Sequence, residues 1–491
     1  MATQTVIDSQ SYKGNDRVLF GMIAGVLVFW LFAQTTLNIA PVMAEDLGVK
    51  TSIMNIAVSI TALFSGIFIV VFGNLADRWG RVLTVKLGFY CSIIGSLLVG
   101  IAPSNNFAES FLMAGRIFQG LSGAFIMPAS LALVKAYWDG AERQRAVSLW
   151  SMGSWGGSGF AALFGGLMAA NIGWRWIFFG AVGLSIVGLL LIRDMPESKA
   201  AAEEDSDFKF DWGGVITFMI MMVGFQIYAT QGGNFGWTST LTLAILAISI
   251  IATIIFIQMG RKNPDSFIDF KLFKNMTYTG ATISNFLLNG TAGILIIAMM
   301  LIQTGGDWSA QQAGLLTLGY AITIVSFIRL GEKLLRKFGP RKPMVWGTLI
   351  VILSIVLLMA TNLYLADYQY LVIIAFSLFS LGLAFYATPS TDAALTALPD
   401  NQVGSGSGIY KMASSLGASF GVAISATVLT MFSKSPDSIQ WIEGVFTFMG
   451  RQDNTAVREA AFFAFGVNLL MAVAALFSIT LTIPKKLKLI N

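Results

Sequence analysis

The sequence contains no histidine and only one cysteine, Cys91. The absence of histidine excludes histidine-based proton relays, histidine metal sites and triads with a histidine base. A single cysteine cannot form an internal disulfide, and its position in an apolar run predicts an inert packing residue. No glycine-rich phosphate loop ending in Gly-Lys-Ser or Gly-Lys-Thr is present. We therefore expect no enzyme centre, no metal, no cofactor and no nucleotide-driven energy coupling.

Charge is also scarce. Only 12% of the 491 residues are charged, whereas 55% are hydrophobic and the mean hydropathy is +0.72. This composition predicts an all-α polytopic membrane protein, in contact with the lipid bilayer. The net charge of +5 comes from basic residues scattered through loops, which does not indicate nucleic-acid binding. The polar residues 1–16 carry no cleavable signal pattern, so we expect the first helix to be retained.

A membrane-spanning helix needs about 20 apolar residues. The sequence contains fourteen such runs, each with boundaries uncertain by several residues. They lie at about 18–40, 52–72, 83–102, 110–134, 144–168, 174–193, 212–231, 238–259, 275–303, 310–331, 343–361, 368–391, 403–432 and 460–483.

Basic residues predict the orientation of these spans. With the N-terminus inside, 24 of the 31 Lys and Arg residues fall on the inner side and five on the outer side. This asymmetry follows the positive-inside rule and places both termini in the cytoplasm. The predicted domains are a six-helix bundle at 1–193, a linker with two extra helices at 194–259, and a second six-helix bundle at 260–491 with an external loop at about 433–459.

A charged stretch, 73–81, lies between the second and third apolar runs. Gly73 and Gly80 would permit close backbone approach and a tight turn. Asp77 can accept hydrogen bonds from a helix N-terminus or pair with a cation, and Arg78 and Arg81 would hold the segment on the positive side of the membrane. On spacing alone, a solvated basic loop is an equally good interpretation.

The stretch 332–341 follows the tenth run as 73–81 follows the second. Aligning Gly339 with Gly80 places Glu332 on Gly73 and Arg336 on Asp77. A degenerate repeat at matching places suggests two duplicated helical halves, as in many secondary transporters.

These motifs resemble those of a known family. The stretch 73–81 resembles the signature between helices two and three of the major facilitator superfamily, and 116–124 resembles a second family motif. The number of predicted spans, fourteen, resembles that of the family's drug:proton antiporter branch. Within that branch, 55–66, 150–159 and 410–417 resemble the NorB/NorC group of quinolone-efflux proteins. The fifth span departs from the family's antiporter motif, because Ala161 and Ala162 stand where a Gly-Pro pair is usual.

Arg116 lies well inside the fourth apolar run. A guanidinium at this depth has to face the bundle interior or an aqueous cavity. One interpretation is a static charge held by backbone carbonyls, which fixes helix packing. The resemblance to the family's arginine motif implies proton coupling or a place on the substrate pathway.

Asp392 and Lys411 form a second pair of candidates for proton coupling. Asp392 follows Pro389 at the end of the twelfth run, and Lys411 lies one or two turns inside the thirteenth. A buried carboxylate beside an ammonium can exchange a proton when a ligand or water displaces its partner. A static ion pair that locks two helices is an equally good interpretation.

The first run lacks the acidic residue that dication exporters of the family carry. In its place, Gln34 and Asn38 share one helical face and would line a cavity with Trp30. Alternatively, these amides only bond neighbouring helices. The other residues expected at the cavity are Gln119, Tyr386 and Tyr410.

The resemblance implies a monomeric bacterial plasma-membrane exporter that exchanges protons for amphiphilic compounds such as quinolone-like drugs. Two six-helix bundles would rock around a central site. Export of a metabolite or a lipid-related compound is the alternative transport function. A sensor or scaffold that keeps the fold without turnover belongs to a third class.

Overall fold

The computed structural model describes residues 12–199, 211–263, 266, 268–306, 308, 310–363, 365–434, 444–450 and 452–485. The regular secondary structure in these residues is helical, which confirms the all-α prediction. The chain forms two compact units. Unit 1 comprises residues 1–212, 263–272 and 395–412, and unit 2 comprises 213–262, 273–394 and 413–491. The predicted three-part division at residues 193 and 259 stays a prediction.

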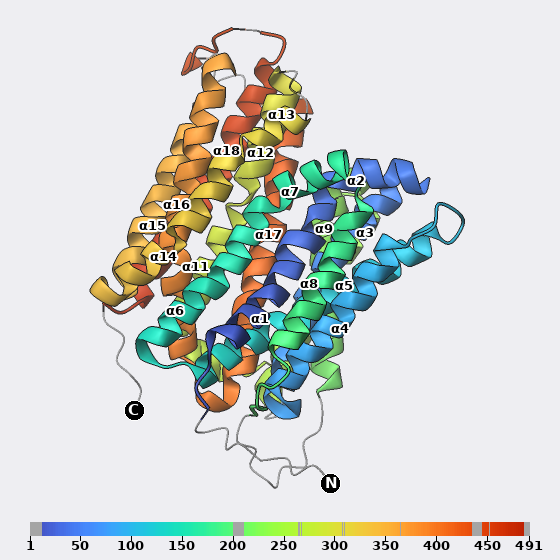
Figure 1. The fold of residues 1–491 in the computed structure, drawn as a ribbon. Coiled ribbons are helices and arrows are strands. Elements are labelled where there is room, and N and C mark those ends of the chain that lie inside the picture. Colours follow the sequence, from blue (N-terminus) through green and yellow to red (C-terminus); the bar gives the residue numbers. More distant parts are fainter. Residues whose placement is uncertain are drawn as a thin grey trace. The chain divides into compact units, whose positions relative to one another are not determined.

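In unit 1, short turns connect the helices (Figure 1). These are α1 (Asp16–Leu27), the π-helix η1 (Val28–Ala33), α2 (Gln34–Leu47), α3 (Thr51–Trp79), α4 (Arg81–Gly100), α5 (Ala108–Tyr137), α6 (Gly140–Ser151), the π-helix η2 (Met152–Gly156), α7 (Gly157–Asn171), α8 (Arg175–Leu191), the 3-10 turn η4 (Asp400–Gln402) and the start of α17 (Val403–Lys434). The 3-10 helix η3 (Phe270–Lys274) begins in this unit.

Unit 2 contains the two extra helices and most of the second half of the chain. Its helices are α9 (Trp212–Phe235), α10 (Thr240–Lys262), α11 (Met276–Gly290), α12 (Gly293–Gly306), α13 (Ala310–Leu315), α14 (Leu318–Phe338), α15 (Arg341–Leu358), α16 (Leu365–Thr396), the rest of α17, and α18 (Thr455–Thr482).

Local sequence signals explain several helix ends. The side chain of Asn15 accepts a hydrogen bond from the amide of Val18 at 3.0 Å and so caps α1. Gly48 ends α2 in the left-handed conformation, with φ +66°. Gly80, with φ +127°, separates α3 from α4 by a single residue. Only glycine adopts such a conformation without strain, so the turn at Gly80 is set by the sequence.

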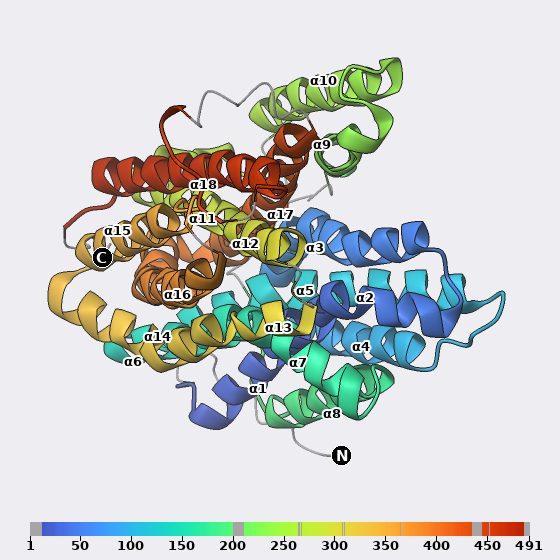
Figure 2. The same cartoon turned by 90° about the horizontal axis from the view of Figure 1, so that it is seen from above.

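Small residues hold the helices of unit 1 close together. Helix α5 lies between α3 and α4 (Figure 2). A Cβ added to Gly95 would lie 2.7 Å from the carbonyl oxygen of Gly115, and one added to Gly120 would lie 2.6 Å from that of Thr61. Side chains at these positions would force the helices apart, as is typical of small-residue contacts between membrane helices.

Eleven helices among the described residues are long and apolar enough to cross a membrane. The segments Leu163–Asn171 and Arg175–Leu191 are bent by 117° and add a twelfth if they form one span. The other predicted spans, about 144–168, 174–193 and 212–231, are helical too. However, η2 interrupts the first, α8 has only 17 residues, and α9 qualifies only as the shorter apolar helix Trp212–Tyr228.

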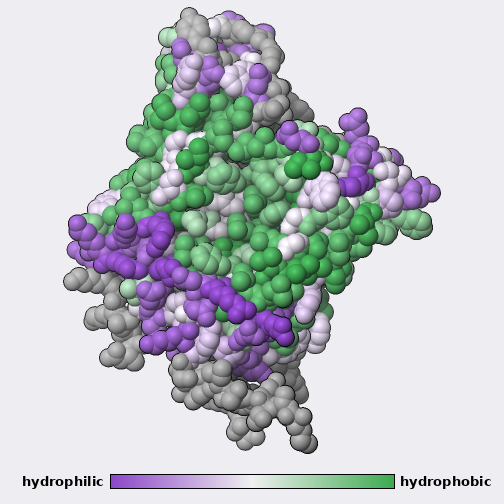
Figure 3. Space-filling model, viewed as in Figure 1, coloured by the Kyte–Doolittle hydropathy of each residue, from purple (hydrophilic) through white to green (hydrophobic). Residues whose placement is uncertain are grey.

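Apolar side chains face outward along these helices. On α10 they include Leu241, Ile248, Ile251 and Ile254, each more than half exposed. On the face shown in Figure 3, hydrophobic residues gather along the middle of the helices and hydrophilic ones toward their ends. Such a surface is stable against lipid and not against water. The chain is a multi-pass membrane protein.

The structure differs from the sequence-based boundaries at two places. The interpretation of 73–81 as a solvated loop is wrong, because α3 continues to Trp79 and only Gly80 breaks the helix. The helix persists because Asp77 is satisfied one turn later by Arg81, so burial carries no unpaired charge. For the predicted external loop, 435–443 and 451 lie outside the described residues, and the residues from Thr455 onward already belong to α18.

Candidate functional site

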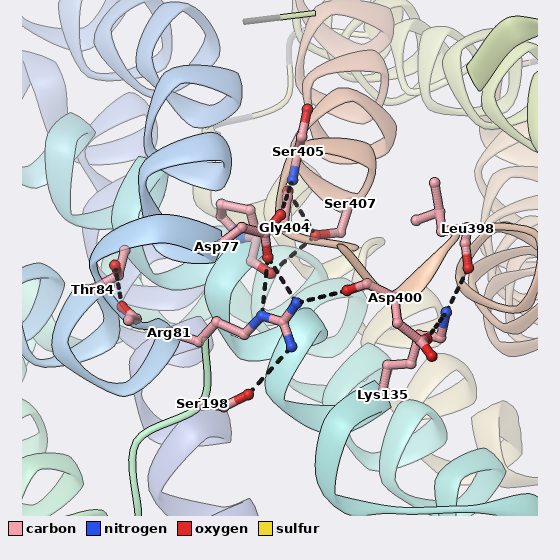
Figure 4. A network of polar contacts seen from close by, with 12 residues as sticks. Asp77, Arg81, Thr84, Lys135, Ser198, Leu398, Asp400, Gly404, Ser405 and Ser407 are labelled. Carbon is pink, nitrogen blue, oxygen red and sulfur yellow. Dashed lines mark hydrogen bonds and ion pairs between the residues drawn. The ribbon is translucent and has the colours of Figure 1, made fainter. Parts of the chain in front are cut away.

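The best-defined polar site of unit 1 is centred on Asp77, near the end of α3 (Figure 4). Its side chain is buried, with 7% exposed. Asp77 Oδ1 accepts hydrogen bonds from Arg81 Nε at 3.0 Å and Nη2 at 2.8 Å. Its second oxygen, Oδ2, accepts from the backbone amide of Ser405 at 3.1 Å. One carboxylate therefore joins α3, α4 and the first turn of α17.

The first turn of α17 can bind a carboxylate through its backbone amides. Backbone amides at a helix start have no acceptor within the helix, and the helix dipole favours negative charge there. The run 404–408, Gly-Ser-Gly-Ser-Gly, lies in this first turn and the next, because α17 begins at Val403.

Two glycines make this contact possible. A Cβ on Gly73 would lie 2.5 Å from the carbonyl oxygen of Gly404, and a Cβ on Gly404 would lie 2.3 Å from that of Gly73. Farther along, a Cβ on Gly408 would lie 2.8 Å from the carbonyl oxygen of Ile69. The backbones of α3 and α17 touch over more than one turn. Gly73 thus permits close approach, as expected.

Arg81 extends the network beyond Asp77. Its Nη1 donates to Ser198 Oγ at 3.3 Å and its Nη2 to the carbonyl oxygen of Asp400 at 3.2 Å. Lys135, from α5, donates to the carbonyl oxygen of Leu398 at 2.6 Å and pairs with the Asp400 carboxylate at 3.0 Å. We call Asp77, Arg81, Ser198, Asp400, Gly404 and Ser405 the Asp77 network.

Arg78 lies apart from this network. Its Nε donates to Asn74 Oδ1 at 3.2 Å, one turn back on the same helix, and its side chain is exposed. The two arginines of the motif therefore differ: Arg81 is buried against Asp77, and Arg78 remains at the surface.

Arg116 is completely buried and held mainly by backbone carbonyls. Nε donates to Ala57 O at 3.0 Å, and Nη1 donates to Ala33 O at 2.8 Å. Nη1 also donates to Thr36 Oγ1 at 3.0 Å and to Gln119 Oε1 at 2.7 Å. The guanidinium ties α5 to α2, α3 and the end of η1. This geometry matches the interpretation of a static charge that fixes packing, and the coupling role stays a prediction.

Gln119 belongs to the same cluster as Arg116. Its Oε1 accepts from Arg116, and its Nε2 donates to Ser96 Oγ at 3.2 Å. Because both ends of the amide are engaged and the residue is 3% exposed, Gln119 holds Arg116 in this state rather than presenting a free polar group.

Lys411 lies in α17, in the part that belongs to unit 1, and is 4% exposed. Its Nζ lies 4.3 Å from the ring centre of Trp150 and 5.7 Å from that of Tyr410. An ammonium over an aromatic face gains about 0.5–2 kcal/mol. Asp392, in α16 of unit 2, is 1% exposed. Their predicted pairing stays a prediction, because they belong to different units.

Of the remaining residues predicted to line the cavity, the structure describes the side chains of some and not of others. Trp30 lies in η1, and its buried indole Nε1 has no hydrogen-bond partner in the described part of the chain. Gln34 and Asn38 fall in α2, but their side chains lie outside the described residues. Tyr386 is fully buried, with its hydroxyl 2.7 Å from Ser284 Oγ and 2.9 Å from Ser390 Oγ.

Sequence reasoning missed Glu197 and Ser198. Glu197 accepts the amides of Val82 at 2.8 Å and Leu83 at 2.9 Å, and so caps α4. A Cβ on Gly80 would lie 2.4 Å from Glu197 Cδ, so this glycine also makes room for the cap. The available signal was an acidic residue four positions after the sixth span, but nothing in the sequence says which helix it caps.

Arg458 was assigned to an outer loop from sequence, yet it is 1% exposed in the first turn of α18. It donates to the carbonyl oxygens of Thr361, Leu363 and Met449, each at 2.8 Å. It therefore fixes two connections of unit 2. In the described residues, no group of three or more Cys, Asp and Glu side chains is placed to hold a metal ion.

The sequence is similar to known proteins over most of its length. The family model of the Major Facilitator Superfamily matches residues 22–267 and 278–488. The chain is 46% identical over 424 residues to the quinolone resistance protein NorB of Staphylococcus aureus strain MRSA252, covering 86% of this chain and 90% of that protein. It is 42% identical over 477 residues to NorB of strain COL, covering 97% and 98%.

A solved structure resembles the fold as a whole. The proton:xylose symporter XylE, a major facilitator protein bound to 6-bromo-6-deoxy-D-glucose, has a TM-score of 0.65 to this chain. The similarity covers 96% of both chains at 16% identity, so it concerns the fold alone. With this fold, the family match and the two relatives, the chain belongs to the Major Facilitator Superfamily of membrane transporters.

Proposed function

We propose that this protein exports amphiphilic compounds, quinolone-type drugs among them, in exchange for protons. The similarity to quinolone resistance proteins over 97% of the chain carries the proposal. The buried Asp77 network supports it, because a transporter needs a seal that forms in one state and breaks in another. The chain would act as a monomer in a bacterial plasma membrane, with both termini in the cytoplasm.

The Asp77 network would be the gate on the cytoplasmic side. Asp77 supplies the charge, Arg81 holds it in place, and Gly73 and Gly80 let the backbones meet and turn. Arg78 would act at the surface, where it holds the motif on the positive side of the membrane. Each charge-assisted hydrogen bond contributes about 1.5–3 kcal/mol. The hydrogen bonds of Asp77 together stabilise the closed gate by an amount of free energy that ligand binding can still overcome.

Asp392 is the proposed proton carrier. It is a buried carboxylate on a helix with an internal proline, Pro389, and a carboxylate in such surroundings can change its protonation between two states. Arg116 and Lys411, both buried cations, are the other residues that we propose for proton coupling. The predicted cavity residues Trp30, Gln34, Asn38, Tyr386 and Tyr410 would contact the compound, with Gln119 acting through Arg116.

The test is drug accumulation in proteoliposomes with an imposed proton gradient, with an ionophore as control. The wild type is expected to accumulate a fluoroquinolone only while the gradient persists. Asp392→Asn is expected to lose gradient-driven accumulation and to keep exchange of labelled for unlabelled drug, because exchange needs no net proton movement. Gradient-driven accumulation by Asp392→Asn at the wild-type level would contradict the proton assignment. Absence of any drug movement by the wild type would contradict the function itself.

A further inference from the structure

Lys411 is a buried cation whose described surroundings are aromatic. Its Nζ lies over the rings of Trp150 and Tyr410, at 4.3 and 5.7 Å from the ring centres. Within the part of the chain that the structure describes, no hydrogen bond or ion pair reaches this ammonium. Aromatic faces offset only part of the cost of taking a charge out of water. The ammonium of Lys411 therefore lacks a negatively charged partner among the described residues.

Trp150 is fixed in its orientation. Its indole Nε1 donates to Ser130 Oγ at 2.9 Å, and Ser130 in turn donates to the carbonyl oxygen of Met127 at 3.1 Å. The ring is fully buried. Because its polar edge is engaged with α5, the ring presents its face to Lys411. An aromatic face beside a cation suits a flat aromatic compound that carries a negative group.

The position of Lys411 relates this site to the Asp77 network. It lies six residues beyond Ser405 on α17, which is about 9 Å along the helix. Between them, Gly404 and Gly408 bring α17 against the backbone of α3. The ammonium thus lies behind a closed backbone contact, and separation of α3 from α17 would expose it.

We propose that Lys411 binds the carboxylate of the exported compound and that Trp150 stacks on its aromatic ring. This inference rests on the proposed export function for the identity of the ligand. A fixed positive charge attracts carboxylates and repels purely cationic drugs. It agrees with a first span that carries no acidic residue between Phe29 and Asn38.

The experiment compares a fluoroquinolone with its ethyl ester, which has the same ring system and no carboxylate. Equilibrium binding to purified protein is measured by tryptophan fluorescence, and transport is measured in proteoliposomes. The variants are Lys411→Gln, which removes the charge, and Lys411→Arg, which keeps it. Lys333→Gln, at an exposed position of α14, is the matched control for loss of one lysine.

For Lys411→Gln we expect the Kd of the acid to rise about ten- to a hundredfold. The Kd of the ester should stay constant or fall, which also shows that the variant is folded. Lys411→Arg should keep most of the acid affinity, and Lys333→Gln should behave as the wild type. The ratio of acid to ester affinity is the quantity that a general structural defect would not change.

Three outcomes overturn the inference. In the first, Lys411→Gln weakens acid and ester equally, as expected if Lys411 serves a carboxylate of the chain itself. In the second, Lys411→Gln leaves the Kd of the acid unchanged. In the third, the wild type binds neither compound. Acid binding that depends on Lys411, in a protein that transports neither compound, would support the anion site and contradict the export function, so the two failures are distinguishable.

Discussion

Replacing Gly404 with alanine tests whether the Asp77 network closes through direct backbone contact. A Cβ at this position would lie 2.3 Å from the carbonyl oxygen of Gly73 and 2.7 Å from Asp77 Cγ. An ordinary contact between carbon and oxygen is about 3.3 Å, so α3 and α17 would have to separate by about 1 Å. Neither atom can be avoided by a side-chain rotation, because one is backbone and the other is held by Arg81.

This separation is enough to break the contact with α17. The bond from the amide of Ser405 to Asp77 Oδ2 is 3.1 Å long and would lengthen to about 4 Å, outside hydrogen-bonding range. Loss of one charge-assisted hydrogen bond costs about 1.5–3 kcal/mol. The closed state would become less populated by about ten- to a hundredfold.

The assay is thiol labelling of Ser405→Cys in a Cys91→Ser background. Ser405 is 6% exposed, so a cysteine there should react slowly while the network is closed and faster after Gly404→Ala. Gly166→Ala is the control, because a Cβ at that helical glycine meets nothing within 4 Å. The same labelling rate in Gly404→Ala and in the control, together with wild-type transport, would refute the reasoning.

Two further substitutions test single contacts. Arg116→Lys keeps the charge but cannot reach Ala33, Ala57 and Gln119 together, so we expect the free energy of unfolding to fall by about 2–3 kcal/mol. Chemical denaturation in detergent measures this loss, and an unchanged midpoint would show that the carbonyl contacts contribute little. Glu197→Gln keeps the size of the cap and removes its charge, which should cost about 1 kcal/mol at the start of α4. Amide exchange of Val82 and Leu83 should quicken, and unchanged exchange there would contradict the cap.

Hydrophobic runs were sufficient to predict the helical class and the approximate places of the apolar helices. This signal is local, so one sequence carries it. The end of α3 was predicted as a loop because Asp77 and Arg78 are charged. Asp77 accepts a hydrogen bond from the amide of Ser405, and its partner Arg81 donates to Ser198, and each of these contacts joins residues more than a hundred positions apart. No local pattern encodes those partners.

The same limit applies to the buried arginines. The depth of Arg116 in an apolar run predicted an interior position, and this is confirmed. The sequence could not show which carbonyls would receive its hydrogens, because these belong to α3 and to the end of η1. Arg458 follows a polar stretch, yet it is buried, because it donates to the carbonyl oxygens of Thr361 and Leu363, which are distant in sequence, and to that of the nearby Met449.

The repeated motif after the tenth span keeps the glycine break but not the position of the acid. Gly339, with φ +73°, ends α14 as Gly80 ends α3. Glu332 Oε1 accepts from Arg336 at 2.5 Å and Oε2 lies 3.7 Å from Arg329 Nε, so both ion pairs of Glu332 are formed within its own helix. It occupies the position aligned with Gly73.

That shift of one turn changes what the motif can do. At Gly73 the missing side chain lets the start of another helix approach, and Asp77 one turn later accepts a hydrogen bond from the amide of Ser405 in that helix. A glutamate at the aligned position fills that space. In unit 2 the close approach occurs one residue earlier instead, where a Cβ on Gly331 would lie 2.3 Å from the carbonyl oxygen of Ala384, in the middle of α16. Amides in the middle of a helix are already bonded and cannot receive a carboxylate. A carboxylate gate is therefore expected in the first half alone, which makes Asp77 a sharper test of the mechanism than the motif as a whole.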